Sequence, residues 1–208
     1  MIHLWGRVTS INVRKVVWAI QELGLPVQRT DAGGAFGLVH EPGYRARNPN
    51  GLVPLLKDDA DGVELWESNV VVRYLCARYG AGVLYPLALP ARFEAEKWMD
   101  WQQTTLNPAG RDAFLQLVRT PPEQRDAERI AASIAATERL LALLDDHLAR
   151  HAFLGGDSFS MADIPVGCEV HCRFGLPLPR PAFPHLDRWY QALCERPGAR
   201  GVLDQLLS

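Results

Sequence analysis

The stretch Asn48-Pro49-Asn50-Gly51-Leu52-Val53-Pro54 decides how the first half of this 208-residue chain is interpreted. It runs into an apolar segment, residues 53–57, with the composition of a short strand, so Pro54 is the second residue of that strand. Proline cannot donate to a sheet ladder and is confined to edges, bulges and strand starts. The segment is therefore either an ordinary turn before an edge strand, or a cis Val53–Pro54 bond that leaves the N–H and C=O of Val53 free for a ligand. Sequence alone favours the turn, because cis bonds are about 5–6% of X–Pro bonds.

Strand and helix signals alternate on the N-terminal side of this stretch. Residues 2–5 are predicted to form an apolar-rich strand, and residues 27–30 a second one. Between them, apolar residues recur at the i, i+3, i+4 and i+7 spacing of a helix, which is expected to end at Gly24. The chain therefore opens with a βαβ unit, followed by a glycine-rich loop (residues 32–51) with a short helix expected near residues 42–46.

A hairpin and a helix follow on the C-terminal side. Residues 53–57 and 63–66 are predicted strands, separated by the turn formers Asp58-Asp59-Ala60-Asp61-Gly62. Residues 67–79 are predicted to form a helix that completes this half. The order βαβ, then αββα, predicts an α/β domain over residues 1–80.

Strand signals vanish after Gly82, and the rest of the chain is predicted to be all-α. We expect a second domain over residues 88–208. Residues 91–118 are predicted to form one long helix bent near Pro108, because proline removes an interior hydrogen bond. A narrow apolar stripe predicts another helix over residues 127–148.

Ser160-Met161-Ala162-Asp163 has the pattern of a helix capping box. We expect Ser160 Oγ to accept from the N–H of Asp163, and the Asp163 carboxylate to reach back to the N–H of Ser160. Phe159 and Ile164 supply the apolar pair on either side. The box predicts a helix start and says nothing about function.

The loop Arg7-Val8-Thr9-Ser10-Ile11-Asn12, between the first strand and the first helix, is a candidate site. A helix start presents unsatisfied N–H groups and the positive end of the dipole, which favour an anion such as a thiolate. Ser10 could donate its O–H to a bound thiolate and lower the pKa of the thiol. The alternative is that Ser10 or Thr9 only caps the helix, and the sequence alone favours that alternative.

Glu67-Ser68-Asn69, directly after the fourth predicted strand, is a further candidate. Ser68 at a helix start offers N–H and O–H groups to a carboxylate, and Glu67 offers a counter-charge to an ammonium group. Together they suit the head group of a free amino acid, which carries both charges. A capped helix start without a ligand explains the same residues about equally well.

These three segments occur in one order on one pattern of strands and helices, and over essentially the whole chain that arrangement resembles the cytosolic glutathione transferases. Residues 48–54 are similar to the segment before that family's cis-proline strand, and residues 67–75 to its glutathione-clasping helix start. Residues 157–163 are similar to its C-terminal capping motif. The resemblance implies a thioredoxin-like, glutathione-binding domain over residues 1–80 and an all-helical domain over residues 88–208.

The resemblance also implies where reduced glutathione, the co-substrate, would lie. Its γ-glutamyl end would be held by Glu67 and Ser68. Its cysteinyl backbone would pair antiparallel with Val53, with Leu52 and Pro54 on either side of that contact. The sulfur would then point at the N-terminus of the first helix.

His40 lies in the glycine-rich loop, where relatives place a residue that touches the glycyl carboxylate or the nearby backbone. It is therefore a candidate glutathione contact. An exposed loop histidine is the alternative. Arg45 and Arg47 are weaker candidates for the same contact.

Family members differ in the side chain that faces the sulfur. This chain has no cysteine before Cys76 and no tyrosine before Tyr44, which argues against the cysteine and tyrosine classes. Ser10 fits a bacterial, serine-type member of the theta or nu kind. Asn12 is a second donor within one turn, so the division of catalysis between Ser10 and Asn12 stays open, with Thr9 as a third option.

The second substrate is expected between the two halves, since ligand sites favour domain interfaces. Four residues share one face of the long helix at i, i+3, i+4 and i+7, namely Trp98, Trp101, Gln102 and Thr105. We expect Trp101, Gln102 and Thr105 to line a pocket for a small hydrophobic electrophile. Trp98 is expected in the core, because an aromatic helical stripe is more often core. Phe36 or the Gly33-Gly34 loop would act as a lid.

Composition and net charge limit the classes of partner that the chain could bind. The chain is 48% hydrophobic and 22% charged, with a formal net charge of −2, so nothing suggests nucleic acid or an acidic membrane. The N-terminus lacks the features of a signal peptide, and no run of about 18 apolar residues suggests a membrane span. We expect a cytoplasmic protein, and the family resemblance implies a homodimer.

The four cysteines (Cys76, Cys168, Cys172 and Cys194) are expected to be free buried thiols. Cys168 and Cys172 are four residues apart and share a helical face, but a metal site would need more ligands. His171 is close in sequence and lies on a different face. We therefore expect no metal.

The sequence as a whole predicts a glutathione transferase, which binds reduced glutathione, stabilises its thiolate and transfers it to an electrophile. Most of the rate gain would come from thiolate activation and proximity. A glutathione-dependent disulfide reductase or peroxidase is one alternative. A non-catalytic protein of the same fold, which binds ligands or partners, is the other. The sequence does not identify the electrophile.

Overall fold

A computed structural model describes residues 1–207 of the chain. The N-terminal half contains the strands β1 (Ile2–Trp5), β2 (Val27–Thr30), β3 (Leu55–Asp58) and β4 (Val63–Trp66), the helices α1 (Ile11–Glu22), α2 (Pro42–Arg45) and α3 (Ser68–Tyr79), and a 3-10 turn at Gly34–Phe36. The strands form one sheet in the order β2-β1-β3-β4. β1 is parallel to β2 and antiparallel to β3, and β3 is antiparallel to β4. This is the thioredoxin-like α/β arrangement that the sequence predicts.

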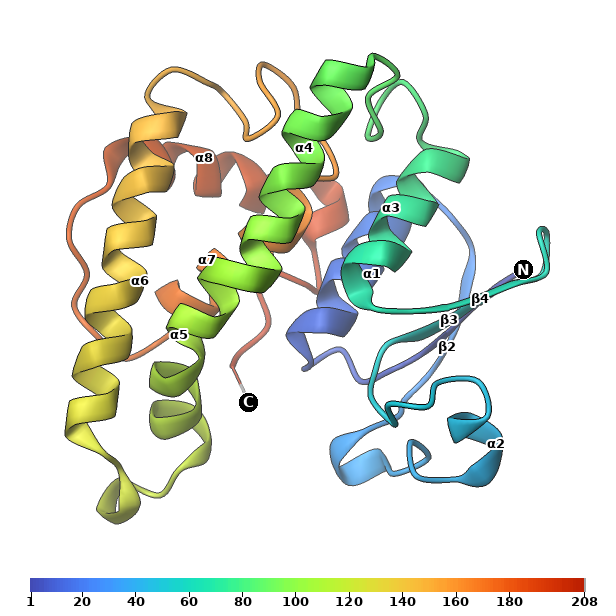
Figure 1. Cartoon of the computed structure of the whole chain (residues 1–208), viewed down its shortest axis with the longest axis horizontal. Coiled ribbons are helices and arrows are strands. Elements are labelled where there is room, and N and C mark those ends of the chain that lie inside the picture. Colours follow the sequence, from blue (N-terminus) through green and yellow to red (C-terminus); the bar gives the residue numbers. More distant parts are fainter. Residues whose placement is uncertain (208) are drawn as a thin grey trace.

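The helices α1 and α3 pack against each other between the sheet and the C-terminal helices (Figure 1). On α1, the predicted apolar positions Val13, Val16 and Ile20 are at most 1% exposed. In the sheet, Leu4 and Leu56 face each other across β1 and β3 and are fully buried. The core of this half therefore lies where the period-3.6 stripe of α1 meets the inward residues of the sheet.

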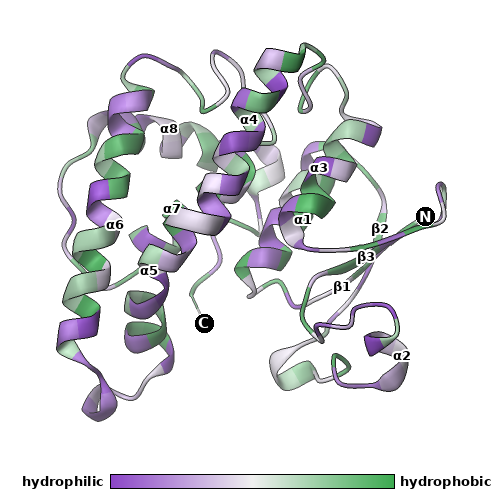
Figure 2. Ribbon diagram, in the orientation of Figure 1, coloured by the Kyte–Doolittle hydropathy of each residue, from purple (hydrophilic) through white to green (hydrophobic). Residues whose placement is uncertain are grey.

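The C-terminal half is all-helical, as predicted. Its elements are α4 (Leu89–Trp101), a π segment (Gln102–Leu106), α5 (Asn107–Phe114), a second π segment (Leu115–Arg119), a 3-10 turn (Pro122–Gln124), α6 (Ala127–Leu148), α7 (Asp163–Phe174), α8 (Pro184–Cys194) and a 3-10 turn (Pro197–Ala199). Figure 2 shows hydrophobic and hydrophilic residues alternating along α6, as expected for a helix with one buried face.

The predicted long helix is present as one continuous run from Leu89 to Arg119. Its local geometry widens to a π segment over Gln102–Leu106, directly before Pro108. Proline has no N–H for the carbonyl four residues earlier, and a π turn before it absorbs the break in the hydrogen-bond ladder. The π segment also rotates the face that the later residues present.

The start of α7 differs from the predicted capping box in one hydrogen bond. The Asp163 carboxylate accepts from the N–H of Ser160 at 2.9 Å, as expected. However, Ser160 Oγ accepts from the N–H of Ala162 at 3.3 Å, and the N–H of Asp163 donates to the Ser160 carbonyl at 3.1 Å. The difference arises because residues 161–162 form a turn before the helix begins.

The two halves are held together by close packing and by ion pairs, among them Arg73 of α3 with Asp100 of α4. An added Cβ at Gly167 of α7 would lie 2.7 Å from Leu193 and 3.0 Å from Trp18 of α1, so only glycine fits between these helices. Arg196 binds the Glu22 carboxylate of α1 through two hydrogen bonds of 2.8 Å each. The position of α1 against the C-terminal half is therefore well defined.

Within residues 1–207, all four cysteines are free. Cys76 and Cys168 are buried and Cys172 is half-buried, whereas Cys194 is exposed, which corrects the expectation of four buried thiols. No helix in this described part of the chain has the length and apolarity to cross a membrane. The same residues contain no group of three or more His, Cys, Asp or Glu side chains arranged to hold a metal.

Candidate active site

The loop between β1 and α1 is held by the sheet and places Ser10 at the start of the helix. Gly6 and Arg7 donate their N–H groups to the carbonyls of Thr30 and Ala32, beside β2. Ser10 is the N-cap of α1 in an extended conformation, and its backbone carbonyl accepts the first helical hydrogen bonds. Its hydroxyl makes no cap hydrogen bond. The capping interpretation therefore does not describe the Ser10 side chain.

The side-chain oxygens of Thr9 and Asn12 have hydrogen-bond partners. Thr9 Oγ1 accepts from Arg7 Nη1 at 2.7 Å, so that hydroxyl is already occupied. Asn12, in the first turn of α1, accepts from Ser68 Oγ at 3.1 Å through its Oδ1. Within residues 1–207 the Asn12 Nδ2 group has no hydrogen-bond partner, and neither has Ser10 Oγ. Two donors at the N-terminus of α1 are thus available to an anion.

The Val53–Pro54 peptide bond is cis. The alternative that sequence statistics disfavoured is therefore correct. Across the described residues, neither the N–H nor the C=O of Val53 has a backbone hydrogen-bond partner. The carbonyl of Leu52 is different, because it accepts from Tyr44 Oη at 2.7 Å and from Asn48 Nδ2 at 2.8 Å. Asn48 and Tyr44 thus fix the segment whose next residue presents free backbone groups to a ligand.

Glu67 and Ser68 lie where β4 turns into α3. Glu67 is exposed and has a φ of 70°, a left-handed conformation that is uncommon for a residue other than glycine. Such local strain is often found at binding sites. Ser68 is only 4% exposed, and its Oγ donates to Asn12 across 56 residues of sequence. The fold therefore brings the start of α1 and the start of α3 into direct contact.

His40 is exposed on the loop before α2. No hydrogen bond or ion pair to its side chain occurs within residues 1–207. Its role as a glutathione contact stays a prediction.

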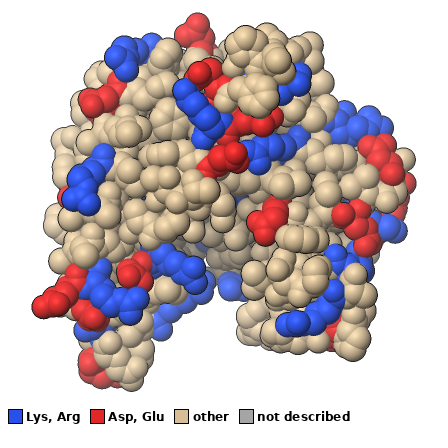
Figure 3. Space-filling model, in the orientation of Figure 1, with Lys and Arg blue, Asp and Glu red and all other residues tan. Residues whose placement is uncertain are grey.

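A cavity lies between the two halves beside this loop. It has a volume of about 890 Å³, counting its open mouth. Thr9, Ser10, Ile11 and Arg14 contribute the side of α1, and residues of α5 to α7 contribute the other walls. Figure 3 shows a hollow between the two halves with basic residues along it. The expected place of a second substrate, at the domain interface next to Ser10, thus contains a cavity.

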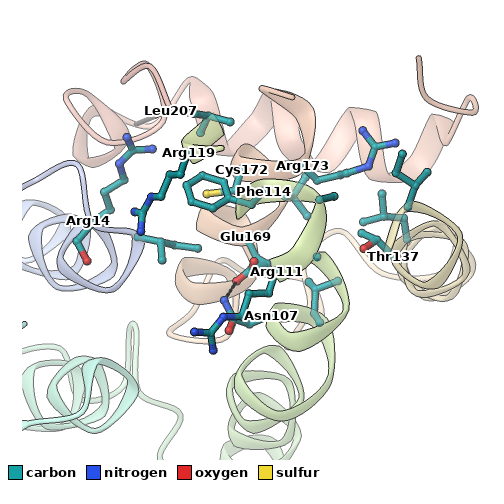
Figure 4. A pocket seen from close by; sticks show the side chains of 18 of the residues that line it. Arg14, Asn107, Arg111, Phe114, Arg119, Thr137, Glu169, Cys172, Arg173 and Leu207 are labelled. Carbon is teal, nitrogen blue, oxygen red and sulfur yellow. Dashed lines mark hydrogen bonds between the residues drawn. The ribbon is translucent and has the colours of Figure 1, made fainter. Parts of the chain in front are cut away.

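The cavity combines apolar walls with charged groups (Figure 4). Its lining includes the apolar residues Ile11, Leu106, Phe114 and Leu141 and the charged residues Arg14, Arg111, Arg119, Arg173 and Glu169. Two of the arginines are tied to the backbone: Arg14 donates to the carbonyls of Val8 and Leu206, and Arg173 donates to the carbonyl of Pro179. The sequence analysis missed these arginines, because they come from three helices that only the fold brings together.

The residues expected at the second substrate lie outside this cavity, and their role there stays a prediction. Trp101, Gln102 and Thr105 do not line the cavity, and its walls come from Leu106, Asn107 and later residues of the same helix. The π segment at 102–106 explains the shift, because it rotates later positions away from the 100° spacing assumed from the sequence. Trp98 is 6% exposed in the core, as predicted, and packs edge-on against Trp101.

Gln102 has a different role, in a buried polar network. Its Oε1 accepts from Lys15 Nζ at 2.9 Å, and its Nε2 donates to the Glu169 carboxylate at 2.7 Å. Asn107 Nδ2 also donates to Glu169, at 3.1 Å. Asn69 donates to Gln102 at 3.3 Å. The sequence analysis did not single out Lys15 or Glu169, and the only available signal was a charged residue within an otherwise buried helix.

The fold and this site together define a class of protein. A thioredoxin-like sheet carries free backbone groups before a cis-proline, a serine at a helix start, and two donors at another helix start. These groups are suited to a peptide backbone, a carboxylate and a thiolate respectively. A cavity at the border with an all-helical domain can hold a second molecule. These features together are those of a glutathione-dependent transferase.

Comparisons with known proteins agree. The family model "Glutathione S-transferase, N-terminal domain" matches residues 4–82, and "Glutathione S-transferase, C-terminal domain" matches residues 106–197. The chain is 47% identical to the glutathione S-transferase GstB of Escherichia coli over 98% of both chains. It is 30% identical to glutathione S-transferase 3 of Zea mays, over 94% of this chain and 90% of the maize protein.

Among solved structures, the theta-class glutathione S-transferase of Xanthomonas axonopodis pv. citri with glutathione bound is similar, with a TM-score of 0.93. Its sequence is 46% identical, over 99% of this chain and 98% of that one. The chain therefore belongs to the glutathione S-transferase family.

Proposed function

We propose that the chain binds reduced glutathione along the edge formed by Val53, Ser68 and the start of α1. The observation that carries this proposal is the free N–H and C=O of Val53 before a cis-proline, next to the Asn12–Ser68 contact. The cysteinyl backbone pairs with Val53, flanked by Leu52 and Pro54. We assign this binding to residues 1–80 and the electrophile pocket to residues 88–208.

The thiolate is stabilised at the N-terminus of α1. Ser10 Oγ and Asn12 Nδ2 are the proposed donors, since both lack a partner within the described residues. Each hydrogen bond to the ionised sulfur lowers the pKa of the thiol, and the helix dipole acts in the same direction. His40 is the proposed contact for the glycyl end.

The electrophile is proposed to occupy the cavity beside Ser10, where it lies close to the sulfur. The apolar walls suit a small hydrophobic electrophile, as the sequence analysis expects. The guanidinium groups of Arg14 and Arg111 at the same cavity add donors for a polar acceptor group on that molecule. The reaction needs no covalent intermediate on the enzyme, because a positioned thiolate attacks directly.

The buried cysteines argue against a disulfide reductase that uses a protein thiolate. Burial raises the pKa of Cys76 and of Cys168 to about 12, so both are thiols at neutral pH. Neither is a reactive thiolate of the kind that disulfide exchange needs. The unoccupied donors at Ser10 and Asn12 argue against a protein that only binds partners, because such a protein has no need of them.

Ser68→Ala tests the proposed anchor for the γ-glutamyl carboxylate. The substitution leaves a charged ligand group without its hydroxyl partner, and we expect glutathione binding to weaken by about 1–3 kcal/mol. Titration calorimetry with reduced glutathione measures the change. An affinity equal to that of the wild-type protein would remove Ser68 from the site.

We further propose a cytoplasmic homodimer, in which the N-terminal half of one subunit faces the C-terminal half of the other. Large apolar side chains on both halves support this, since Leu52 is 66% exposed, Trp66 37%, Val70 43% and Phe93 59%. Light scattering at micromolar concentration should give twice the chain mass of 23.2 kDa. A mass equal to one chain would refute the dimer.

A further inference from the structure

Lys15 is a buried cation directly beneath the proposed carboxylate anchor. It lies on the face of α1 that is covered by the C-terminal half, and its side chain is 0% exposed. Taking an ammonium group out of water is costly unless hydrogen bonds and a counter-charge compensate. The Lys15 charge therefore needs compensation from surrounding groups or from a bound ligand.

The hydrogen-bond partners of Lys15 are all neutral. Its Nζ donates to Gln102 Oε1 at 2.9 Å, to Gln103 Oε1 at 3.4 Å and to Ser68 Oγ at 3.5 Å. No ion pair to Lys15 occurs among the described residues. The nearest compensation is Glu169, whose carboxylate is separated from Lys15 by the Gln102 amide. Burial lowers the pKa of the Lys15 ammonium, and Glu169 opposes that shift.

The hydrogen bond to Ser68 places the Lys15 ammonium group beside the proposed glutathione site. Lysine can only donate, so Ser68 Oγ accepts from it. Ser68 in turn directs its own proton outward, to Asn12 in the free protein. A carboxylate oxygen one hydrogen bond beyond Ser68 Oγ would lie about 6 Å from Lys15 Nζ. Lys15 is 0% exposed and Ser68 4%, so the path between the two charges runs through buried protein and their attraction is less screened than in open solvent.

We propose that Lys15 is a positioning residue that supplies the buried counter-charge for the α-carboxylate of the γ-glutamyl group, acting through Ser68. This inference rests on the proposed glutathione site. It adds a residue that touches no ligand atom and nevertheless determines preference for a ligand with a carboxylate at that position. Glu169 limits the effect, because it already neutralises part of the Lys15 charge.

The test pairs two ligands with two proteins in titration calorimetry. The ligands are reduced glutathione and 4-aminobutyryl-cysteinyl-glycine, which lacks only the α-carboxylate. Lys15→Met is expected to weaken glutathione binding by about 10- to 100-fold and binding of the analogue by at most about twofold. Lys57→Met is the matched control, since Lys57 is exposed and paired with Asp59. It should bind both ligands as the wild-type protein does.

A structural role for Lys15 predicts a different outcome, because a distorted site would lose affinity for both ligands equally. Equal losses, or no loss for glutathione, would overturn the proposal. If the wild-type protein binds neither ligand, the proposed function fails and takes this inference with it. A wild-type protein that binds glutathione, with an unchanged Lys15→Met, overturns only the role of Lys15.

Glu169→Gln provides a second variant with an effect of opposite sign, in case Lys15→Met does not fold. Removing the carboxylate leaves the Lys15 charge less compensated. Affinity for glutathione should therefore rise severalfold, while affinity for the analogue stays the same. Unchanged or weaker discrimination between the two ligands in Glu169→Gln would contradict the proposal.

Discussion

Removing the main donor to the glutathione sulfur is expected to lower turnover at pH 7 by about 10²-fold, as for the loss of one preorganised donor in other active sites. Ser10→Ala and Asn12→Ala are the two substitutions to compare. Ser10 Oγ has no partner within residues 1–207, so Ser10→Ala should change glutathione affinity little. Asn12 also accepts from Ser68, so Asn12→Ala should weaken binding as well as turnover.

Asn12→Asp tests the donor role of Asn12 more severely. A carboxylate at this position still accepts from Ser68 Oγ, but it has no N–H for the sulfur and repels a thiolate. If Asn12 is the main donor, Asn12→Asp should lose more turnover than Asn12→Ala, because its carboxylate repels the thiolate. The measurement is the pH profile of kcat/KM for the electrophile at saturating glutathione, whose inflection should move to higher pH when the donor is lost. Unchanged profiles for both Ser10→Ala and Asn12→Ala would leave activation to backbone N–H groups and the helix dipole.

Asp163→Ala is expected to lower the free energy of unfolding by about 3–5 kcal/mol, the range for breaking a buried charged network. Asp163 is fully buried and accepts from the N–H groups of Leu154 and Ser160 and from Trp189 Nε1, at 2.8–2.9 Å. Alanine would leave three buried donors unpaired. Urea denaturation followed by circular dichroism measures the loss. A loss below about 1 kcal/mol would mean that these hydrogen bonds do not hold the start of α7.

The same residue gives stability a pH dependence. Burial raises the pKa of Asp163 from 3.8 to about 6, against the opposing effect of its hydrogen bonds. The folded state therefore binds more protons than the unfolded state between these values, and unfolding free energy falls as pH rises through them. Relative to Asp163→Asn, the wild-type protein should lose about 2 kcal/mol between pH 4 and pH 7. A difference that is constant with pH would show that Asp163 keeps an ordinary pKa.

The parts of the fold that depend on local pattern could be predicted from the sequence. The apolar spacing of α1, the turn formers before β4 and the stripe of α6 are each determined by neighbours within one helix or hairpin. The cis bond before Pro54 could not be derived that way. The sequence favoured an ordinary turn with a trans bond, and that interpretation was wrong. The tertiary contacts of this segment, in which Tyr44 and Asn48 bind the Leu52 carbonyl, override the average preference for trans.

The parts of the site that depend on long-range contacts were missed. Lys15 and Gln102 are hydrogen-bonded 87 residues apart, and no spacing rule links them. The residues expected to form a second-substrate pocket do not line the cavity, and the π segment before Pro108 is not visible in a 3.6-residue periodicity. The charged lining of the cavity likewise depends on three helices that meet only in the folded chain.

The central claim is that the start of α1 holds the sulfur of bound glutathione as a thiolate. Its most direct test is an ultraviolet titration of the wild-type protein saturated with reduced glutathione, in which thiolate absorbance is followed across pH. A free cysteine-type thiol has a pKa of about 8.5, and we predict that the bound thiol titrates at least one unit lower, at about 7.5 or below. Bound glutathione that titrates like the free tripeptide would contradict the account.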